Sequence, residues 1–153
     1  MPAMVPDPSS WLLLCRRVRF GDTDAAGVLH APRLLRWCHE AYEESLERYG
    51  ISAAQVFPTP GHPLAVALPI VHCQADFRRP LVCGDPLAIR LAPRRLDSSS
   101  FEVRYAFVCD DQPAAEGLTR HVAIAAASRQ RCALPEPLNR WLEASSLGGV
   151  QTL

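Results

Sequence analysis

The chain has 153 residues, which suffices for one domain with a buried core and is short for two. Hydrophobic residues make up 48% of it and charged residues 21%, a balance that argues against a disordered chain. Sixteen basic residues offset sixteen acidic ones, so no net charge attracts nucleic acid or an anionic membrane, and we expect neither as a partner.

The six cysteines stand singly, without the paired spacing of a zinc site or the density of a disulfide framework. Four lie in apolar runs, where cysteine packs as a small buried hydrophobe: Cys15, Cys38, Cys73 and Cys109. Residues 1–10 are proline-rich and read as a disordered lead. The apolar run Trp11–Cys15 that follows is too short for a signal peptide or a membrane span. We expect a soluble cytoplasmic protein with reduced thiols.

Two periodic patterns follow in the first half of the chain. Alternating side chains predict a strand over residues 12–20, one face of which is basic. Pro32 suits the first turn of a helix, apolar residues then recur at helical spacing as far as Tyr49, and Gly50 ends the run. A helix of roughly 18 residues measures about 27 Å, which spans a small domain, so we expect it at the centre of the fold.

The second half of the chain predicts a sheet. Residues 51–63 hold three prolines and a glycine and read as an irregular loop. Four strand-like runs come next, separated by short turn segments that favour antiparallel neighbours: 64–77, 87–96, 101–109 and 114–127. Pro69 inside the first run indicates a sheet edge or a bulge. We assign residues 11–128 to one domain and residues 129–153 to a C-terminal extension with a weak helix over 136–144 and a frayed tail.

The order of these elements is a strand, a long helix and four antiparallel strands. It predicts an α+β hotdog fold, in which the antiparallel sheet wraps one apolar face around the single central helix. The exposed edges of such a sheet favour pairing with a second copy. We therefore expect a homodimer or a dimer-of-dimers tetramer, with each active site at a protomer boundary.

The segment between the first strand and the helix contains the candidate catalytic residues. Residues 21–28 read Gly-Asp-Thr-Asp-Ala-Ala-Gly-Val and place Asp22 and Asp24 directly before a helix start. The first N–H groups of a helix have no intrahelical partner, so they can polarise a carbonyl while a nearby carboxylate activates water or attacks. On this pattern alone Asp24 fits a turn-forming role as well as a catalytic one, and Asp22 fits a bracing role.

With Phe20 in front, this segment resembles the signature of the 4-hydroxybenzoyl-CoA thioesterase family of hotdog enzymes. Three further segments resemble the cyanobacterial 1,4-dihydroxy-2-naphthoyl-CoA thioesterases of phylloquinone synthesis within that family: Cys38–Glu43, Leu68–His72 and His121–Ala125. The resemblance covers most of the chain. It implies a hydrolase of aromatic acyl-CoA thioesters in which Asp24 is catalytic and the Ala31 N–H holds the thioester oxygen. It implies no cofactor, because CoA is part of the substrate.

Four further residues are candidates for contacts with the substrate. His30, beside the helix start, and His72 are expected to line the acyl pocket. The family's CoA-binding bases have no counterpart in the turn over 97–100, so Arg94 and Arg95 just before it are the candidates for the CoA phosphates. The adjacent bases at residues 78–79 and at 94–95 are ordinarily solvated strand ends, but the phosphate charges of CoA would give one such pair a use. The histidines and aspartates around the helix start match no metal-ligand spacing, so no metal site is predicted.

Three alternatives remain open. Another hotdog branch carries its catalytic acid on the helix, where Glu40 lies beside the apolar stripe. The chain could also be a broad acyl-CoA thioesterase that acts on fatty or phenylacetyl thioesters, or a non-catalytic module that binds acyl carriers. The carboxylate in the signature argues against the module, which has no need for an acid near a thioester.

Overall fold

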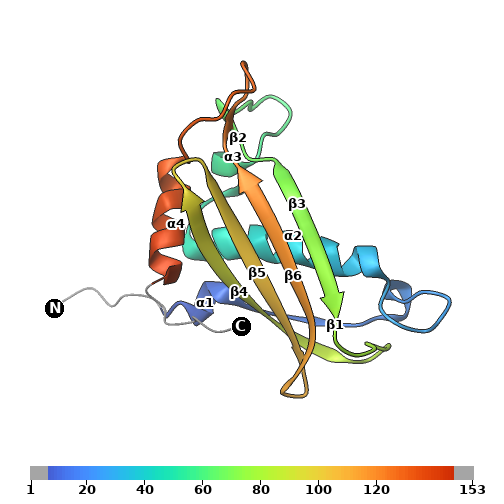
Figure 1. Ribbon diagram of the computed structural model, residues 1–153. Helices are drawn as coiled ribbons and strands as arrows, with labels where there is room; N and C mark the ends of the chain where they lie inside the picture. The colour runs from blue at the N-terminus through green and yellow to red at the C-terminus, as the bar shows by residue number, and fades with distance from the viewer. Residues whose placement is uncertain (1–6, 147–153) are drawn as a thin grey trace.

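The computed structural model describes residues 7–146, and Figure 1 shows their arrangement. The elements in chain order are α1 (Ser9–Leu12), β1 (Leu13–Arg17), the 3-10 turn η1 (Phe20–Asp22), α2 (Ala31–Tyr49), α3 (Ala53–Val56), β2 (Val66–Ala67), β3 (Ile70–Phe77), β4 (Pro86–Asp97), β5 (Ser100–Cys109), β6 (Gln112–Val122), β7 (Ile124–Ala125) and α4 (Glu136–Ser146). None of the helices within residues 7–146 combines the length and the apolar character needed to cross a membrane.

A five-stranded antiparallel sheet, in the order β1-β4-β5-β6-β3, forms the body of the fold. The short strands β2 and β7 pair in a separate two-stranded sheet. In Figure 1 α2 crosses behind the large sheet and α4 lies beside β4. The predicted architecture, an antiparallel sheet around one long central helix, is confirmed.

The core lies between α2 and the sheet. Alternate residues of β5 face the helix and are at most 1% exposed: Phe101, Val103, Tyr105 and Phe107. Helix and sheet approach closely at Gly117 of β6, where a Cβ atom would overlap the Cys38 sulfur of α2. Glycine at this position therefore sets how closely α2 can pack on the sheet.

The link between β3 and β4 differs from the predicted turn between neighbouring strands. β3 pairs with β6 at one edge of the sheet, and β4 lies next to β1 at the other. The link carries the chain from β6 towards β1: the Arg78 N–H donates to the Ala114 carbonyl (2.9 Å) and the Gly84 N–H to the Val18 carbonyl (2.7 Å). Turn residues in the sequence indicated where the chain leaves β3. Contacts between residues distant in sequence determine the strand with which β4 pairs.

The two ends of the described chain are more ordered than expected. Residues 9–12 form α1, so Ser9 and Ser10 of the predicted lead are helical. β1 is shorter than the predicted strand over 12–20, because α1 takes residue 12 and the chain leaves the sheet after Arg17. At the other end, Trp141 of α4 donates a hydrogen bond from Nε1 to the Ser45 hydroxyl of α2 (3.1 Å). Trp141 belongs to the same hydrophobic core as the sheet and α2. The remainder of the lead, residues 1–6, and the tail at 147–153 lie outside the described residues.

The expected burial of the four cysteines is confirmed for two of them and wrong for two. Cys38 and Cys109 are buried, whereas Cys15 and Cys73 are exposed. The exposed pair lies on β1 and β3, the edge strands of the sheet, where an apolar run in the sequence does not lead to a covered side chain in one protomer.

Candidate active site

The loop between β1 and α2 is built around the Asp22 carboxylate. Asp22 Oδ2 accepts the Arg19 N–H (2.9 Å), and Oδ1 lies 3.1 Å from Nε of Arg33 in the first turn of α2. The Asp22 carbonyl accepts the His30 N–H (2.8 Å) directly before the helix begins. Asp22 thus braces both ends of the loop, and with its side chain 14% exposed it has little surface left for a substrate.

Asp24 lies in the same loop with an exposed side chain. Its Oδ1 accepts the Ala26 N–H (2.8 Å) and the Val28 N–H (3.4 Å), while the Asp24 N–H donates to the Val28 carbonyl (2.9 Å). Gly27, with φ of 79°, supplies the left-handed residue that this tight turn requires. Among the described residues no donor reaches Oδ2. One carboxylate oxygen is therefore held by the backbone, and the other is available to a substrate or to water.

The N-terminus of α2 offers a single unpaired donor beside this loop. His30 occupies the N-cap position without a side-chain cap bond, and Pro32 has no N–H. The Arg33 N–H donates to the His30 carbonyl (2.9 Å). The Ala31 N–H meets no acceptor within residues 7–146 and lies at the positive end of the helix dipole, which makes it suited to a carbonyl oxygen that gains negative charge.

Asp24 and Ala31 line one cavity of about 510 Å³. The loop is attached to the opposite wall of this cavity by the Leu29 N–H, which donates to the Leu81 carbonyl (2.7 Å). The same wall carries Arg78 and Arg79. The lining residues thus include an acid with a free carboxylate oxygen, a residue with an unpaired N–H and two arginines. The acid can attack a carbonyl carbon, the N–H can stabilise the carbonyl oxygen, and the arginines can bind phosphates.

A second cavity of about 690 Å³ runs along α2 towards β3. Apolar side chains of both elements line it together with polar and charged ones: Pro32, Leu35, Ile70 and Cys73; His39 and Thr119; and Arg33, Arg36, Glu40 and Glu43. His30, the residue before Ala31, also lines it. The two cavities therefore lie against neighbouring residues at the start of α2: Ala31 lines the first, and His30 and Pro32 line the second.

The other predicted contact residues lie away from Asp24 within one protomer. His72 is exposed on β3, with Nε2 3.0 Å from the Gln74 side chain, and it precedes Phe77 in the wall of the Asp24 cavity by five residues. At about 3.4 Å per residue, that separation is about 17 Å. Arg95 donates to the Asn139 side chain of α4. Of the predicted set, the structure brings together Asp24, Ala31 and His30 only.

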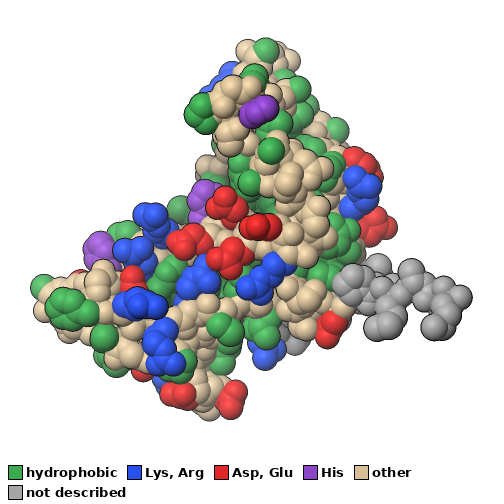
Figure 2. All heavy atoms as spheres, turned by 180° about the vertical axis from the view of Figure 1, so that it is seen from behind, with side chains coloured by type: hydrophobic (Ala, Val, Ile, Leu, Met, Phe, Trp, Pro, Cys, Tyr) green, Lys and Arg blue, Asp and Glu red, His purple; other side chains and the backbone are tan. Residues whose placement is uncertain are grey.

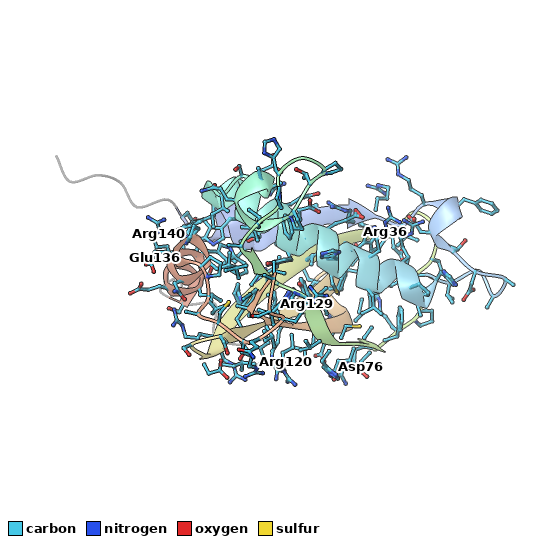
Figure 3. The ribbon with its side chains drawn as sticks, turned by 90° about the horizontal axis from the view of Figure 1, so that it is seen from above. Arg36, Asp76, Arg120, Arg129, Glu136 and Arg140 are labelled. Atoms are coloured by element: carbon cyan, nitrogen blue, oxygen red, sulfur yellow. The ribbon has the colours of Figure 1, made fainter. Side chains whose placement is uncertain are left out.

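Arg94 is engaged on the face of the sheet opposite α2. Glu102 is 1% exposed there and accepts hydrogen bonds from Arg94 (2.6 Å) and Arg120 (3.2 Å), with Arg104 3.7 Å away. Figure 3 shows Arg120 on this side of the sheet, away from α2. Burial raises the pKa of Glu102, but the bonds from Arg94 and Arg120 outweigh burial and hold it below its usual value. Arg94 thus stabilises a buried carboxylate.

Glu40, the rival acid, lies on the charged outer side of α2. Its carboxylate oxygens are 3.8 Å from the Arg16 guanidinium and 3.6 Å from the Arg36 guanidinium. Figure 2 shows acidic and basic side chains intermixed over this face of the molecule. Glu40 borders the cavity along α2 but is surrounded by cations, whereas no cation lies within ion-pair distance of Asp24 among the described residues. This geometry favours Asp24 as the reacting acid.

The sequence left one feature of the site open and missed another. It did not decide between the bases at 78–79 and those at 94–95 for the CoA phosphates, and the path of the 78–85 link places Arg78 and Arg79 at the Asp24 cavity. Thr119 carried no signal, since a threonine within a strand is ordinary. No group of three or more His, Cys, Asp or Glu side chains in the described chain is placed to hold a metal ion.

Comparison with known proteins shows to which family the chain is similar. The family model of the thioesterase-like superfamily matches residues 18–142. A Synechococcus sp. strain RCC307 protein named 1,4-dihydroxy-2-naphthoyl-CoA hydrolase is 63% identical over 128 residues, which cover 84% of this chain and 98% of that protein.

Two crystal structures are also similar. A thioesterase candidate from Prochlorococcus marinus strain MIT 9313 superposes with a TM-score of 0.88 at 58% identity, covering 92% of this chain and 99% of that one. A 1,4-dihydroxy-2-naphthoyl-CoA thioesterase from Synechocystis superposes with a TM-score of 0.78 at 33% identity, covering 86% and 94% of the two chains.

Proposed function

We propose that this chain, which belongs to the thioesterase-like superfamily, hydrolyses 1,4-dihydroxy-2-naphthoyl-CoA to 1,4-dihydroxy-2-naphthoate and CoA in phylloquinone synthesis. The observation that carries the proposal is the free carboxylate oxygen of Asp24 in one cavity with the unpaired Ala31 N–H. The names of the relatives support the choice of acyl group, and the cavity along α2 offers space for it.

The chemistry follows from these two groups. The Ala31 N–H binds the thioester oxygen and stabilises its charge as the carbonyl carbon becomes tetrahedral, a contribution of about 3 kcal/mol for a well-placed donor. Asp24 Oδ2 either attacks that carbon, giving an anhydride that water then hydrolyses, or takes the proton of an attacking water. In both routes the C–S bond breaks, the CoA sulfur leaves with the electron pair and gains a proton, and the carboxylic acid is released.

We expect the CoA phosphates to bind the two arginines that line the Asp24 cavity. Arg78 and Arg79 line it directly, whereas Arg94 and Arg95 are engaged with Glu102 and Asn139. Arg78 is 57% exposed and pairs with Glu116 at 2.9 Å, a surface ion pair that a phosphate can replace at small cost. We therefore assign the nucleotide end of CoA to Arg78 and Arg79.

A homodimer that pairs through β3 supplies a role for His72. β3 is an edge strand, and its Ile70, Val71 and Phe77 side chains are 39%, 57% and 41% exposed. An antiparallel copy centred on the middle of β3 brings the partner subunit's His72 opposite Ala75, two residues from Phe77 in the Asp24 cavity. The active site then lies at a protomer boundary.

All six cysteines are unpaired, which supports a reducing, cytoplasmic location.

The test is the release of free thiol from a panel of CoA thioesters. We expect kcat/KM for the dihydroxynaphthoyl thioester to exceed that for acetyl- or hexanoyl-CoA by about 10²-fold or more, with benzoyl thioesters between them, because a fused ring buries more apolar surface. Equal or better turnover of long-chain fatty acyl-CoA would point to a broad thioesterase. Absence of hydrolysis with every thioester would point to a binding module.

A further inference from the structure

An ion pair joins the loop that holds Asp24 to the first turn of α2. Nε of Arg33, the third residue of the helix, lies 3.1 Å from Oδ1 of Asp22, and the two side chains are 35% and 14% exposed. The acids that pair with arginines elsewhere on α2, Glu40 and Glu44, are 38% and 37% exposed. The Asp22 carboxylate is thus better shielded from water, and a shielded pair holds its partners more firmly than a solvated one.

The turn that contains Asp24 is a compact unit with few contacts to the core. Its hydrogen bonds run between residues 24 and 28, and Thr23 pairs with Leu29 in a short antiparallel bridge. Residues 24–27 are exposed, and Leu29 is the buried side chain of this segment. The turn projects from the body of the molecule beside the start of α2 (Figure 1). Apolar packing therefore does little to orient it, and the contacts at its base determine where Asp24 lies.

At this base, Asp22 is attached to the start of α2 at two points. Its carbonyl accepts the His30 N–H (2.8 Å), and its carboxylate meets the Arg33 guanidinium. The Leu29 N–H, which donates to the Leu81 carbonyl (2.7 Å), holds the other end of the turn. Two points of attachment at Asp22 fix an orientation that a single hydrogen bond leaves free to rotate. Arg33 supplies the second of these points.

The ion pair links the two segments that carry the reacting groups. Asp24 follows Asp22 by two residues, and Ala31 precedes Arg33 by two. The Asp24 oxygen and the Ala31 N–H must both reach one thioester group, and a displacement of ~1 Å in an active site can cost about 10²-fold in rate. The placement of Asp24 relative to the Ala31 N–H therefore depends on the contact between Asp22 and Arg33.

We infer that Arg33 is a positioning residue, which acts through the Asp22 carboxylate to hold the Asp24 turn against the start of α2. Asp24 and the Ala31 N–H then meet the same thioester. This inference rests on the proposed function and gives Arg33 no contact with the reacting atoms. Arg33 also lines the cavity along α2, so the experiment has to separate positioning from substrate binding.

The first measurement is steady-state hydrolysis of 1,4-dihydroxy-2-naphthoyl-CoA by Arg33→Gln. We expect kcat to fall about tenfold and KM to change less than about twofold, because the turn loses its orientation while the cavities keep their lining. Arg33→Lys keeps a cation for Asp22 and should recover most of kcat. Arg48→Gln, the matched control, removes a cation that pairs with Glu44 near the other end of α2 and should keep kcat. Thermal unfolding checks that the variants fold.

Two double-mutant cycles then identify the path of the effect. In Asp22→Asn one amide oxygen faces two donors, the Arg19 N–H and the Arg33 guanidinium, so this variant weakens the same contact. Asp22→Asn and Arg33→Gln together should therefore cost no more than the larger of the two single losses. In the Asp24→Asn background, Arg33→Gln should change kcat less than about twofold, since the group that it positions is already removed.

The outcomes separate the inference from the proposed function. A higher KM with unchanged kcat in Arg33→Gln would assign Arg33 to substrate binding and overturn the inference. Unchanged kcat and KM, additive losses in the first cycle, or an undiminished loss in the Asp24→Asn background would overturn it too. In each of these cases the wild-type protein still hydrolyses the thioester and the proposed function stands. If the wild-type protein hydrolyses no thioester, the proposed function fails, and the inference fails with it.

Discussion

Asp22 and Asp24 are two residues apart and have different roles because their oxygens meet different partners. Both oxygens of Asp22 are occupied, by a backbone N–H and by the Arg33 guanidinium, so this residue stabilises the loop. Asp24 has one oxygen held by backbone N–H groups and one free. At the residue scale, the chemistry depends on which lone pairs the fold leaves unused.

This difference predicts the effect of removing each charge. In Asp24→Asn the amide oxygen can still accept the Ala26 N–H, so the loop keeps its shape while the nucleophile or base is lost. We expect kcat to fall by about 10³-fold or more with little change in thermal unfolding. Steady-state thioester hydrolysis measures the first effect and calorimetry the second.

The matched controls are Asp22→Asn and Glu40→Gln. Glu40 is paired with two guanidinium groups on the outer side of α2, so its charge is not expected to act on the substrate. Each control should cost far less in kcat than Asp24→Asn. A nearly inactive Glu40→Gln together with an active Asp24→Asn would show that the helix acid is the catalytic one.

His121 predicts a dependence of stability on pH. Its pKa is lowered from 6.5 to about 3 in the folded protein, first by burial and then by His39, so the unfolded chain binds a proton that the folded chain does not. Stability therefore falls as pH drops below 6.5, by up to about 1.4 kcal/mol per pH unit for this one group. Urea unfolding between pH 6.5 and 4.5 should show a smaller decrease in the free energy of unfolding for His121→Phe than for the wild-type protein. An equal dependence on pH in the two proteins would contradict this account.

At the scale of elements, the contact between α2 and β6 depends on one small residue. A Cβ at Gly117 overlaps the Cys38 sulfur, and both residues are buried between helix and sheet. Gly117→Ala forces the helix or the cysteine to shift, and we expect it to lower the free energy of unfolding by about 1–3 kcal/mol.

A double-mutant cycle checks that the overlap is the cause. Cys38→Ala removes the sulfur and leaves space for the new methyl group, so Gly117→Ala should cost less in that background than in the wild-type chain. Denaturant unfolding of the four proteins gives the coupling energy. Additive effects would mean that the destabilisation by Gly117→Ala does not arise from overlap with the Cys38 sulfur.

At the scale of the whole molecule, β3 is the least covered element of the large sheet. Seven of its eight residues are exposed and one is half-buried, although the strand is rich in apolar side chains. An unpaired edge of this kind is normally blocked or paired, and nothing within residues 7–146 covers it. Pairing with a second copy satisfies its free N–H and carbonyl groups and buries its side chains.

A charge on β3 should therefore separate the copies. We expect sedimentation of the wild-type protein at a multiple of 16.9 kDa, and of Val71→Asp at or near the mass of one chain, with hydrolysis lost in parallel. Leu96→Asp is the control, because Leu96 is an apolar residue at the end of β4 that is 38% exposed. A wild-type monomer that is stable and active would contradict the proposal.

The sequence by itself determined the features that depend on neighbours along the chain. The helix over 31–49 follows from apolar residues at helical spacing, with Pro32 and Gly50 at its ends. The position of Asp24 before that helix follows from a short turn-forming segment and from the resemblance to a known signature. Both depend on contacts within a few residues, which local pattern can describe.

Only the tertiary structure decided which distant segments meet. The pairing of β3 with β6 leaves β3 at an edge, and the link that follows places Arg78 and Arg79 at the Asp24 cavity. Thr119 faces the cavity along α2 only because β6 lies under that helix. The physical reason is that strand pairing and cavity lining depend on contacts between residues far apart in the chain, which no short window of sequence contains.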